Sequence, residues 1–476
     1  MPRPLFVLTL LVAFGGALAP LSAQGAPGPE PDNAAPPPPP RATIKPRTYT
    51  LTECLALAER NHPNLWAARA RLAFVHAQLD EARYAPWFNW GMSAAGGVLP
   101  PITGSIFFTS TPVTARNLGG LDKVQPAFSF DLNGAVPLWT FGKITSVREA
   151  AEAQVRVSEW DMEKARQSVR SDVRRAYYGL LLTRDAKYIV DDSISRLKKG
   201  IDGLKEKLAK GERSVQQTDV LRLEVFYEEV IARSGEPARG AVYAMSALRF
   251  LTGVQTAFDV PDEPLKRPDR PLVDVAQYLA AARLFRPEIN MARAGVIARQ
   301  KWVDYNRAKF FPDIGLGMGA SYATSPSATT QITAWSNDPF NRFFYYAGFG
   351  VRWNLDILPN AARVAQAEAQ LEETRAWERL ALGGTMVEVE AAYGIAVEAK
   401  GREEAWARAE QKAKQWIVTV QDSIDIGTSD ERQLLDPARL YANAQLNHLL
   451  ALMDLNVAMS ELARVSGWDS AAPTGK

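Results

Sequence analysis

Four segments of the chain alternate hydrophobic and polar residues with a period of two, the pattern that predicts β-strands. In one of them Phe128, Phe130 and Leu132 share a face, while Ser129 and Asp131 point the other way. Each segment is about ten residues long, which suits a tilted strand that crosses a membrane. The four predicted strands are at about 87–98, 126–138, 312–323 and 344–355. Two half-buried hairpins in a soluble domain would give the same alternation.

Helical periodicity surrounds each strand pair. Amphipathic helical segments precede the strands at about 50–84 and 274–311, and long proline-free segments follow them from Lys143 to Gly211 and from Asn360 to Gly427. About 68 residues at 1.5 Å each give a rod about 100 Å long. Apolar residues spaced three and four apart are typical of a coiled coil, as in Ile194, Leu197, Ile201, Leu204 and Leu208. Each rod is predicted to end at its glycine.

A shorter return helix is predicted after each rod. Capping boxes would start these helices, with Ser214 and Gln217 as N-cap and N3 in the first and Thr428 and Glu431 in the second. A return helix and an opening helix together are about as long as a rod. We therefore expect them to stack end to end beside it.

The same order of elements occurs twice, which indicates a tandem duplication. The string AEAQ begins at Ala151 and again at Ala367, and the same offset relates Tyr177 to Tyr393. The predicted repeats are 48–253 and 274–468, each a helix, two strands and a long helical hairpin. A proline-rich linker, 254–273, joins them, and a disordered tail is predicted at 469–476.

The N-terminal segment predicts export from the cytoplasm. Arg3 precedes the apolar run from Leu5 to Leu18, and small residues follow up to Ala23. This is the pattern of a signal peptide over residues 1–23 rather than of a membrane anchor, since the apolar run is short. A stiff proline-rich tether is predicted over 24–47. No later apolar run reaches eighteen residues, so we expect no membrane-spanning helix.

Composition narrows the function. Lys and Arg (55) nearly balance Asp and Glu (53), so a nucleic-acid partner is not expected. The single cysteine, Cys54, excludes an intrachain disulfide. The string GLGMG at Gly315 precedes a strand rather than a helix, and Ser195 with Lys198 lies on the coiled-coil seam, so neither indicates an enzyme. No catalytic, cofactor-binding or metal site is predicted.

The strand count points to an oligomer. Four strands cannot close a barrel, the smallest membrane barrels have eight, and an open edge in lipid leaves backbone groups unpaired. A cyclic homotrimer would supply twelve strands. The predicted fold is a transmembrane β-barrel in outer membrane lipid, continued by an α-helical barrel of coiled-coil hairpins.

Two segments resemble TolC-like outer-membrane efflux proteins. They are YTLTECLALAERNHPNLWAARARL from Tyr49 and GTSDERQLLDPARLYANAQLNHLL from Gly427, and the resemblance extends over residues 48–468. It implies a passive trimeric exit duct in the outer membrane of a Gram-negative bacterium. It also implies partners, a periplasmic adaptor (membrane fusion) protein and an inner-membrane pump, in an efflux or type I secretion system. The alternative is a soluble periplasmic coiled-coil adaptor, which would not explain the strands.

The resemblance also suggests functional positions. Adaptors would grip the helix tips, at Gly211, Ser214, Gly427, Thr428 and Ser429. Acidic residues of the return helices line the periplasmic constriction in the family, and Asp219 and Asp436 match two such positions, with Gln433 in place of a third acid. The alternative for Asp219 and Asp436 is that they are ordinary surface charges on a solvated helix face. Aromatic residues at the strand ends would mark the membrane interface: Trp87, Trp139, Phe141, Phe310, Phe311 and Trp353.

Overall fold

A computed structural model describes residues 47–471 except 88, 103–123, 212–214, 331–336, 427 and 430. The predicted signal peptide and all of the predicted tether except Arg47 lie outside the described residues. The first half contains β1 (Arg47–Thr48), α1 (Leu51–Asn61), α2 (Pro63–Tyr84), β2 (Asn89–Leu99), β3 (Gln125–Trp139), α3 (Lys143–Ala209), α4 (Gln217–Arg233) and α5 (Gly235–Thr252). The second contains β4 (Phe258–Asp259), α6 (Val275–Phe285), α7 (Pro287–Ala308), β5 (Asp313–Thr324), β6 (Arg342–Arg352), α8 (Ile357–Asp425), the 3₁₀ turn η2 (Glu431–Leu434), α9 (Leu435–Val465) and α10 (Trp468–Ala471).

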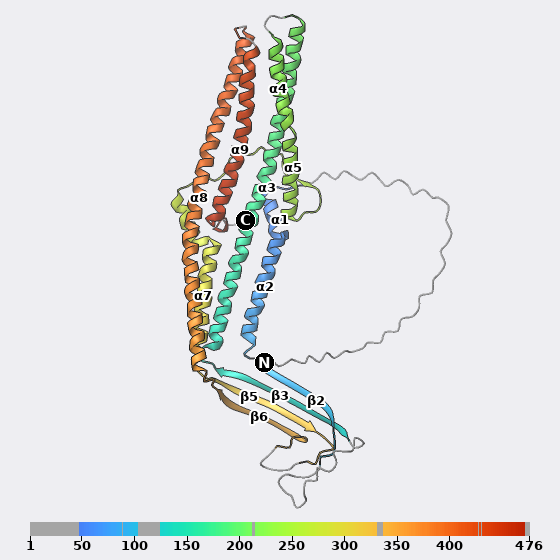
Figure 1. Cartoon of the computed structure of the whole chain (residues 1–476), viewed down its shortest axis with the longest axis vertical. Helices are drawn as coiled ribbons and strands as arrows, with labels where there is room; N and C mark the ends of the chain where they lie inside the picture. The colour runs from blue at the N-terminus through green and yellow to red at the C-terminus, as the bar shows by residue number, and fades with distance from the viewer. Residues whose placement is uncertain are drawn as a thin grey trace, which may run out of the picture. The chain divides into compact units, whose positions relative to one another are not determined.

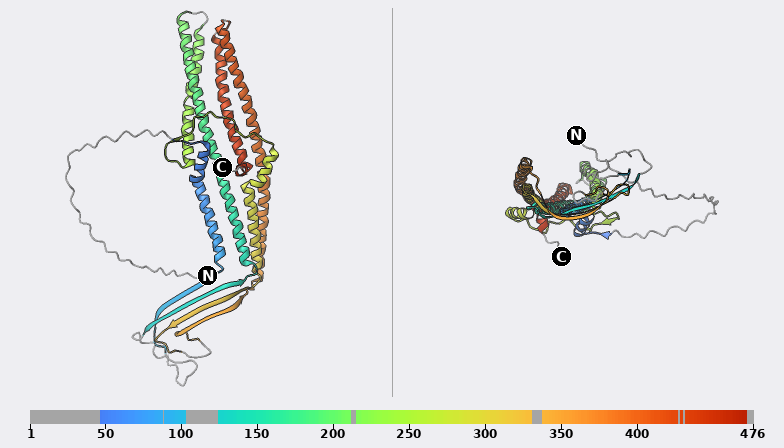
Figure 2. Two further views of the ribbon diagram at one scale, coloured as in Figure 1. Left: turned by 180° about the vertical axis from the view of Figure 1, so that it is seen from behind. Right: turned by 90° about the horizontal axis from the view of Figure 1, so that it is seen from below.

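The long strands form one four-stranded antiparallel sheet in the order β2-β3-β5-β6. They are therefore not two separate hairpins. The sheet curves across its width (Figure 2, right). Among the described strands, none pairs with the outer edge of β2 or β6.

The two long helices are continuous, with 67 residues in α3 and 69 in α8. Helix α3 packs against α2, α5, α7 and α9, and α8 packs against α7 and α9 (Figure 1). Strand β3 enters α3 at its N-terminus, and the connection to α4 leaves at its C-terminus. The sheet and the first helix tip are thus separated by the full length of α3, about 100 Å at 1.5 Å per residue.

Each opening segment is two helices rather than the single one predicted. The break falls before Pro63 in the first half and before Pro287 in the second. Proline disfavours helical geometry in the residue that precedes it. His62 and Arg286 accordingly have extended backbones, with ψ of 130° and 122°. The return segment of the first half is also broken, at Ser234 between α4 and α5.

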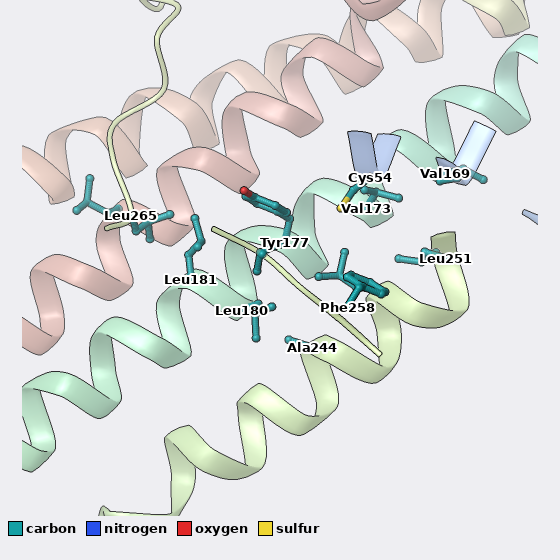
Figure 3. Close-up of a cluster of buried hydrophobic side chains, with 14 of the residues drawn as sticks. Cys54, Val169, Val173, Tyr177, Leu180, Leu181, Ala244, Leu251, Phe258 and Leu265 are labelled. Atoms are coloured by element: carbon teal, nitrogen blue, oxygen red, sulfur yellow. The ribbon is translucent and has the colours of Figure 1, made fainter. Parts of the chain in front are cut away.

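The larger hydrophobic core lies where α1, α3, α5 and the inter-repeat linker meet (Figure 3). Leu248 and Val173 are fully buried there, and Tyr177 lies beside Cys54 and Phe258. Burial raises the pKa of the Cys54 thiol to about 11, so it stays protonated and packs as an apolar side chain. A second core joins α6, α8 and α9 around Tyr278, Val389, Ala396 and Leu462.

The linker over 254–273 is more ordered than its prolines suggest. Strand β4 within it pairs in parallel with β1, so Arg47 belongs to a strand and not to a free tether. The linker is ordered at this point because the side chain of Phe258 packs into the larger hydrophobic core, where it is 3% exposed. The guanidinium of Arg184 on α3 binds Asp259 and the carbonyl of Val260.

Both predicted capping boxes differ from the structure. Helix α4 begins two residues later than predicted, with Gln216 as N-cap and Asp219 as N3. Ser214 lies outside the described residues. In the second half Thr428 does not cap a helix, since its hydroxyl donates to the carbonyl of Ser423 and α9 begins only at Leu435. The turn η2 occupies the intervening residues.

The predicted disordered tail begins too early. Residues 468–471 form the short helix α10, and Asp469 is 8% exposed. Its carboxylate pairs with Arg174 of α3, and its carbonyl accepts a hydrogen bond from Arg170. These contacts tie the end of the second half to α3. Residues 472–476 lie outside the described part of the chain.

One stretch of α8 is long and apolar enough, by length and composition, to cross a membrane. This finding contradicts the expectation that the chain has no helix long and apolar enough to cross a membrane. Only 22% of that stretch is buried within the chain. It consequently presents apolar surface on a helix that also packs against α7 and α9.

Candidate functional site

The two faces of the sheet differ in chemistry. Cross-strand partners place Met92, Leu132, Ala320 and Tyr345 in one row on the apolar face. On this face Phe349 is 82% exposed. An exposed apolar surface of this extent is costly in water and favourable in lipid.

The opposite face carries polar and small residues. The neighbouring row across the sheet is Ser93, Asp131, Ser321 and Phe344. Ser321 Oγ donates to Asp131 Oδ1 over 2.6 Å, and Arg342 donates to both of them, at 2.7 Å to Ser321 Oγ and 3.2 Å to Asp131 Oδ1. This cluster bridges β3, β5 and β6. Sequence reasoning missed it, because the strand register decides which polar residues meet.

Glycines let aromatic rings lie flat against the sheet. A side chain at Gly134 would collide with the ring of Trp90 at 2.4 Å, and one at Gly319 would meet the ring of Tyr346 at 2.7 Å. The rings thus cover glycines on the adjacent strand, Trp90 on the apolar face and Tyr346 on the polar one. Larger residues at either glycine would displace the ring.

The six predicted interface aromatics lie at the strand ends nearest the helices. Phe141 stacks on Phe311 with ring centroids 5.2 Å apart, and Trp139 meets Phe141 edge-on at 6.1 Å. Trp353 Nε1 donates to the carbonyl of Phe310 over 3.0 Å. Trp87 precedes β2 and is 50% exposed. Five of the six come from β3, β5 and β6 or their flanks, and the register brings their ends together.

The described tip residues are held by backbone geometry. Gly211 follows α3 with a φ of 75°, a left-handed conformation that favours glycine at a helix end. In the second tip the amides of Thr428 and Ser429 both donate to the carbonyl of Ser423. Gly427 and Ser214 lie outside the described residues.

The gate candidates stand at the starts of the return helices. Asp219 Oδ2 accepts the amide of Gln216 over 2.9 Å, which caps α4. Asp436 is exposed in the first turn of α9, and Gln433 is exposed in η2. Acidic groups at these positions are favoured by the helix dipole. Within one chain Asp219 lies on the first helical hairpin, and Asp436 and Gln433 lie on the second. Asp219 also caps α4.

The outer membrane efflux protein family matches the chain twice, over residues 54–220 and 279–468. The cation efflux system protein CusC of Escherichia coli (strain K12) is 26% identical over 215 residues, which are 44% of this chain and 45% of CusC. The chain thus matches less than half the length of this curated relative.

Solved structures match over most of the chain. A CusC structure has a TM-score of 0.69 at 16% identity, over 88% of this chain and 92% of that one. The Campylobacter jejuni CmeC outer membrane channel has a TM-score of 0.67 at 18% identity, over 88% and 85%. The open state of the Neisseria gonorrhoeae MtrE outer membrane channel has a TM-score of 0.68 at 18% identity, over 88% of both chains. At these identities the likeness is one of fold.

Proposed function

The chain belongs to the outer membrane efflux protein family, and on that premise we propose that it is the passive exit duct of a tripartite efflux or type I secretion system. The chain is an outer membrane protein of a Gram-negative bacterium with a periplasmic helical part. The family groups efflux proteins, not enzymes. Export energy would then come from an inner-membrane pump, reached through a periplasmic adaptor.

The observation that carries the proposal is the open edge of the sheet. Strands β2 and β6 have unpaired outer edges among the described strands, and the apolar face beside them is exposed. Unpaired backbone groups in lipid cost several kcal/mol each, roughly, so the edges must find partners. Three copies would pair β2 of one with β6 of the next and give a closed barrel of twelve strands.

The polar face would then line the lumen. The row of Ser93, Asp131 and Ser321 and the glycines of β5 and β6 would face water, while Tyr345 and Phe349 would face lipid. The aromatic cluster at the helix-proximal strand ends would lie at the periplasmic membrane interface. The long helices of three chains would continue the tube. The matched lengths of α2 and α7, 22 residues each, favour an origin by tandem duplication.

Cysteine crosslinking tests the shared barrel. Ser93→Cys in β2 is combined in turn with Tyr346→Cys, Gly348→Cys and Gly350→Cys in β6, in purified protein in mild detergent. At least one pair should give covalent trimers on denaturing gels. The same β6 cysteines combined with Asn133→Cys in the inner strand β3 are the matched control and should give none. A monomeric mass by light scattering together with no crosslink from any pair would overturn the shared barrel.

Single-channel recording tests the gate. If Asp219 and Asp436 face the axis, a trimer places six carboxylates at one constriction, which favours cations and binds multivalent ones. The Asp219→Asn/Asp436→Asn variant should lose cation selectivity and lose block by a trivalent cation on the periplasmic side. Asp304→Asn on α7 is the control. Unchanged selectivity and block in the double variant would leave the two acids as helix-capping and surface charges.

Site-directed crosslinking tests the adaptor contact. Cysteines at Ser214 and Ser429 in the helix tips should crosslink to the cognate periplasmic adaptor. Thr145→Cys, exposed at the sheet end of α3, serves as a control near the barrel. Crosslinks from the control without any from the tips would contradict the assignment.

A further inference from the structure

A cluster of ionisable groups around the buried carboxylate of Glu403 joins the second hairpin to the inter-repeat linker. Glu403 of α8 is 1% exposed, and its Oε1 atom is contacted by Arg267 Nε at 2.8 Å and by His448 Nε2 at 3.1 Å. His448 of α9 reaches Glu410 of α8 with its other ring nitrogen, Nδ1 to Oε2 at 2.5 Å. The histidine thus lies between two carboxylates.

The charge state of the cluster follows from this geometry. A neutral imidazole carries one N–H, whereas an imidazolium carries two. Since both ring nitrogens face carboxylate oxygens, only the protonated ring donates in both contacts. With His448 protonated, the two positive groups balance Glu403 and Glu410. Without that proton, a lone pair of His448 would face Glu403 inside the protein.

Glu403 has little means of adjusting to such a loss. Its Oε2 atom is buried without a hydrogen-bond partner among the described residues. A buried carboxylate is stable only when its charge is well compensated. Loss of the His448 proton would leave Arg267 as the one cation paired with Glu403 among the described residues, and the Arg267 side chain is 56% exposed.

The linker is held from both sides at this point. On the side of the second hairpin, Asn456 of α9 donates to the carbonyl of Lys266 over 2.8 Å, next to Arg267. On the side of the first hairpin, the amide of Leu265 donates to Asp185 of α3 over 2.8 Å. Neighbouring linker residues therefore connect α3 with α8 and α9.

We propose that His448, Glu403, Glu410 and Arg267 form a proton-dependent latch that ties the linker, and through it the first hairpin, to the second. The latch is closed while His448 is protonated and loosens as the pH rises. Histidine is the side chain that changes charge near neutral pH. This coupling does not depend on the transport function proposed above.

The surrounding charges do not replace the proton. On α8, Glu404 adds a further negative charge near Arg267. On α9, burial and the charge of Glu410 raise the pKa of Tyr441, which therefore stays neutral. On α3, Arg196 near Tyr441 is paired with Asp192 at 2.8 Å.

Hydrogen–deuterium exchange of the full chain in detergent tests the latch. After correction for intrinsic exchange rates, amide protection in residues 262–268 should fall about tenfold between about pH 5.5 and about pH 8.5, roughly 1.4 kcal/mol of opening free energy. In His448→Gln and in Glu403→Gln the protection should be low and independent of pH. His76→Gln changes an exposed histidine of α2 and should keep the wild-type pH profile.

A second variant covers the case in which changes at the buried positions prevent folding. Arg267→Gln alters the exposed member, so the helices should assemble normally while the linker is released at every pH. A wild-type linker whose protection does not change with pH overturns the proposal. So does an unchanged pH profile in His448→Gln or Arg267→Gln.

Discussion

The two helix breaks before proline use one backbone geometry with different side-chain chemistry. At the first break, His62 is 4% exposed, its Nδ1 atom accepts the amide of Asn64 over 3.2 Å, and its ring meets Phe250 edge-on. At the second, Arg286 is 3% exposed and pairs with Glu388 of α8 at 2.5 Å. One break is capped by a neutral ring, and the other is held by an ion pair.

The backbone contacts around the two breaks correspond closely. Asn61 Nδ2 donates to the carbonyl of Thr252 at the end of α5, and Arg286 Nη1 donates to the carbonyl of Arg464 near the end of α9. Trp66 Nε1 donates to the backbone carbonyl of Arg60, and Asn290 Nδ2 donates in the same way to the backbone carbonyl of Leu284. The comparison shows that backbone geometry and proline position define the junction. The buried side chain can then be aromatic or ionic.

The ionic junction should be the more costly one to break. Arg286 also contacts Glu288 at 2.8 Å, so replacing Arg286 by Met removes a cation that Glu388 and Glu288 share. Glu388 keeps Arg464, and Glu288 keeps Lys164. Removing one member of a buried pair costs roughly 3–5 kcal/mol, and the remaining partners together with the 42% exposure of Glu388 place the expected loss at or below the lower end, about 2–3 kcal/mol.

Exchange protection across α6 and α7 measures this loss. Arg293→Met, which removes exposed hydrogen bonds to the carbonyl of Arg283 and to Asn290 Oδ1, is the control and should cost about 1 kcal/mol or less. Equal losses of protection in the two variants would show that the ion pair of Arg286 stabilises the protein no more than the exposed hydrogen bonds of Arg293 do.

Three glycines with positive φ give a graded series. Gly467 follows α9, and a methyl group there would lie 2.8 Å from the backbone of Phe285. At Gly253, after α5, it would meet the side chain of Asn61 at 2.7 Å, while at Gly211 it would meet no atom of the described residues within 4 Å. Alanine should therefore cost about 1–2 kcal/mol at Gly211 for the left-handed backbone alone, and more at Gly253 and Gly467.

Thermal unfolding of the three alanine variants tests the series. The expected order of destabilisation is Gly467 above Gly253 above Gly211, because backbone cannot move aside as a side chain can. A Gly211→Ala variant as unstable as Gly467→Ala would show that φ, rather than the contact, sets the cost.

The two junctions should also respond differently to acid. Burial lowers the pKa of His62 below its ordinary value, partly offset by Asp172. A histidine with a lowered folded-state pKa stabilises the protein above its unfolded pKa, and this contribution is lost as the pH falls through the folded pKa. Protonation of Nδ1 would also remove the bond from Asn64.

Exchange protection of residues 58–66 should therefore decrease between about pH 6.5 and about pH 5.5, while residues 282–290, whose junction is an arginine–carboxylate pair without a histidine, should not respond in that range. His62→Asn keeps a capping acceptor and should lose the acid response. This is the smallest of the three effects, and an equal acid response at both junctions would contradict the assignment to His62.

Local sequence patterns predicted a helix or strand correctly where a single pattern defined it. The period-two alternation located four strands, and the absence of proline located two helices of nearly seventy residues. The helix predicted after Gly211 begins two residues too early, because Asp219 Oδ2 accepts the amide of Gln216 and so places the cap at Gln216, a contact that the Ser214-x-x-Gln217 pattern does not indicate. The prediction of single opening helices was wrong because Pro63 and Pro287 force an extended backbone on the preceding residue, although the helical periodicity continues past each proline.

The sequence by itself therefore determined the order of elements, the two-faced strands and the resemblance to a family. Tertiary structure alone decided which distant groups meet: Asp131 with Ser321 and Arg342 across three strands, and Arg267 with Glu403 and His448 across a linker and two helices. The physical reason is that periodicity is a property of neighbouring residues. Contacts between residues 45 or more positions apart depend on strand register and helix packing, which no local pattern encodes.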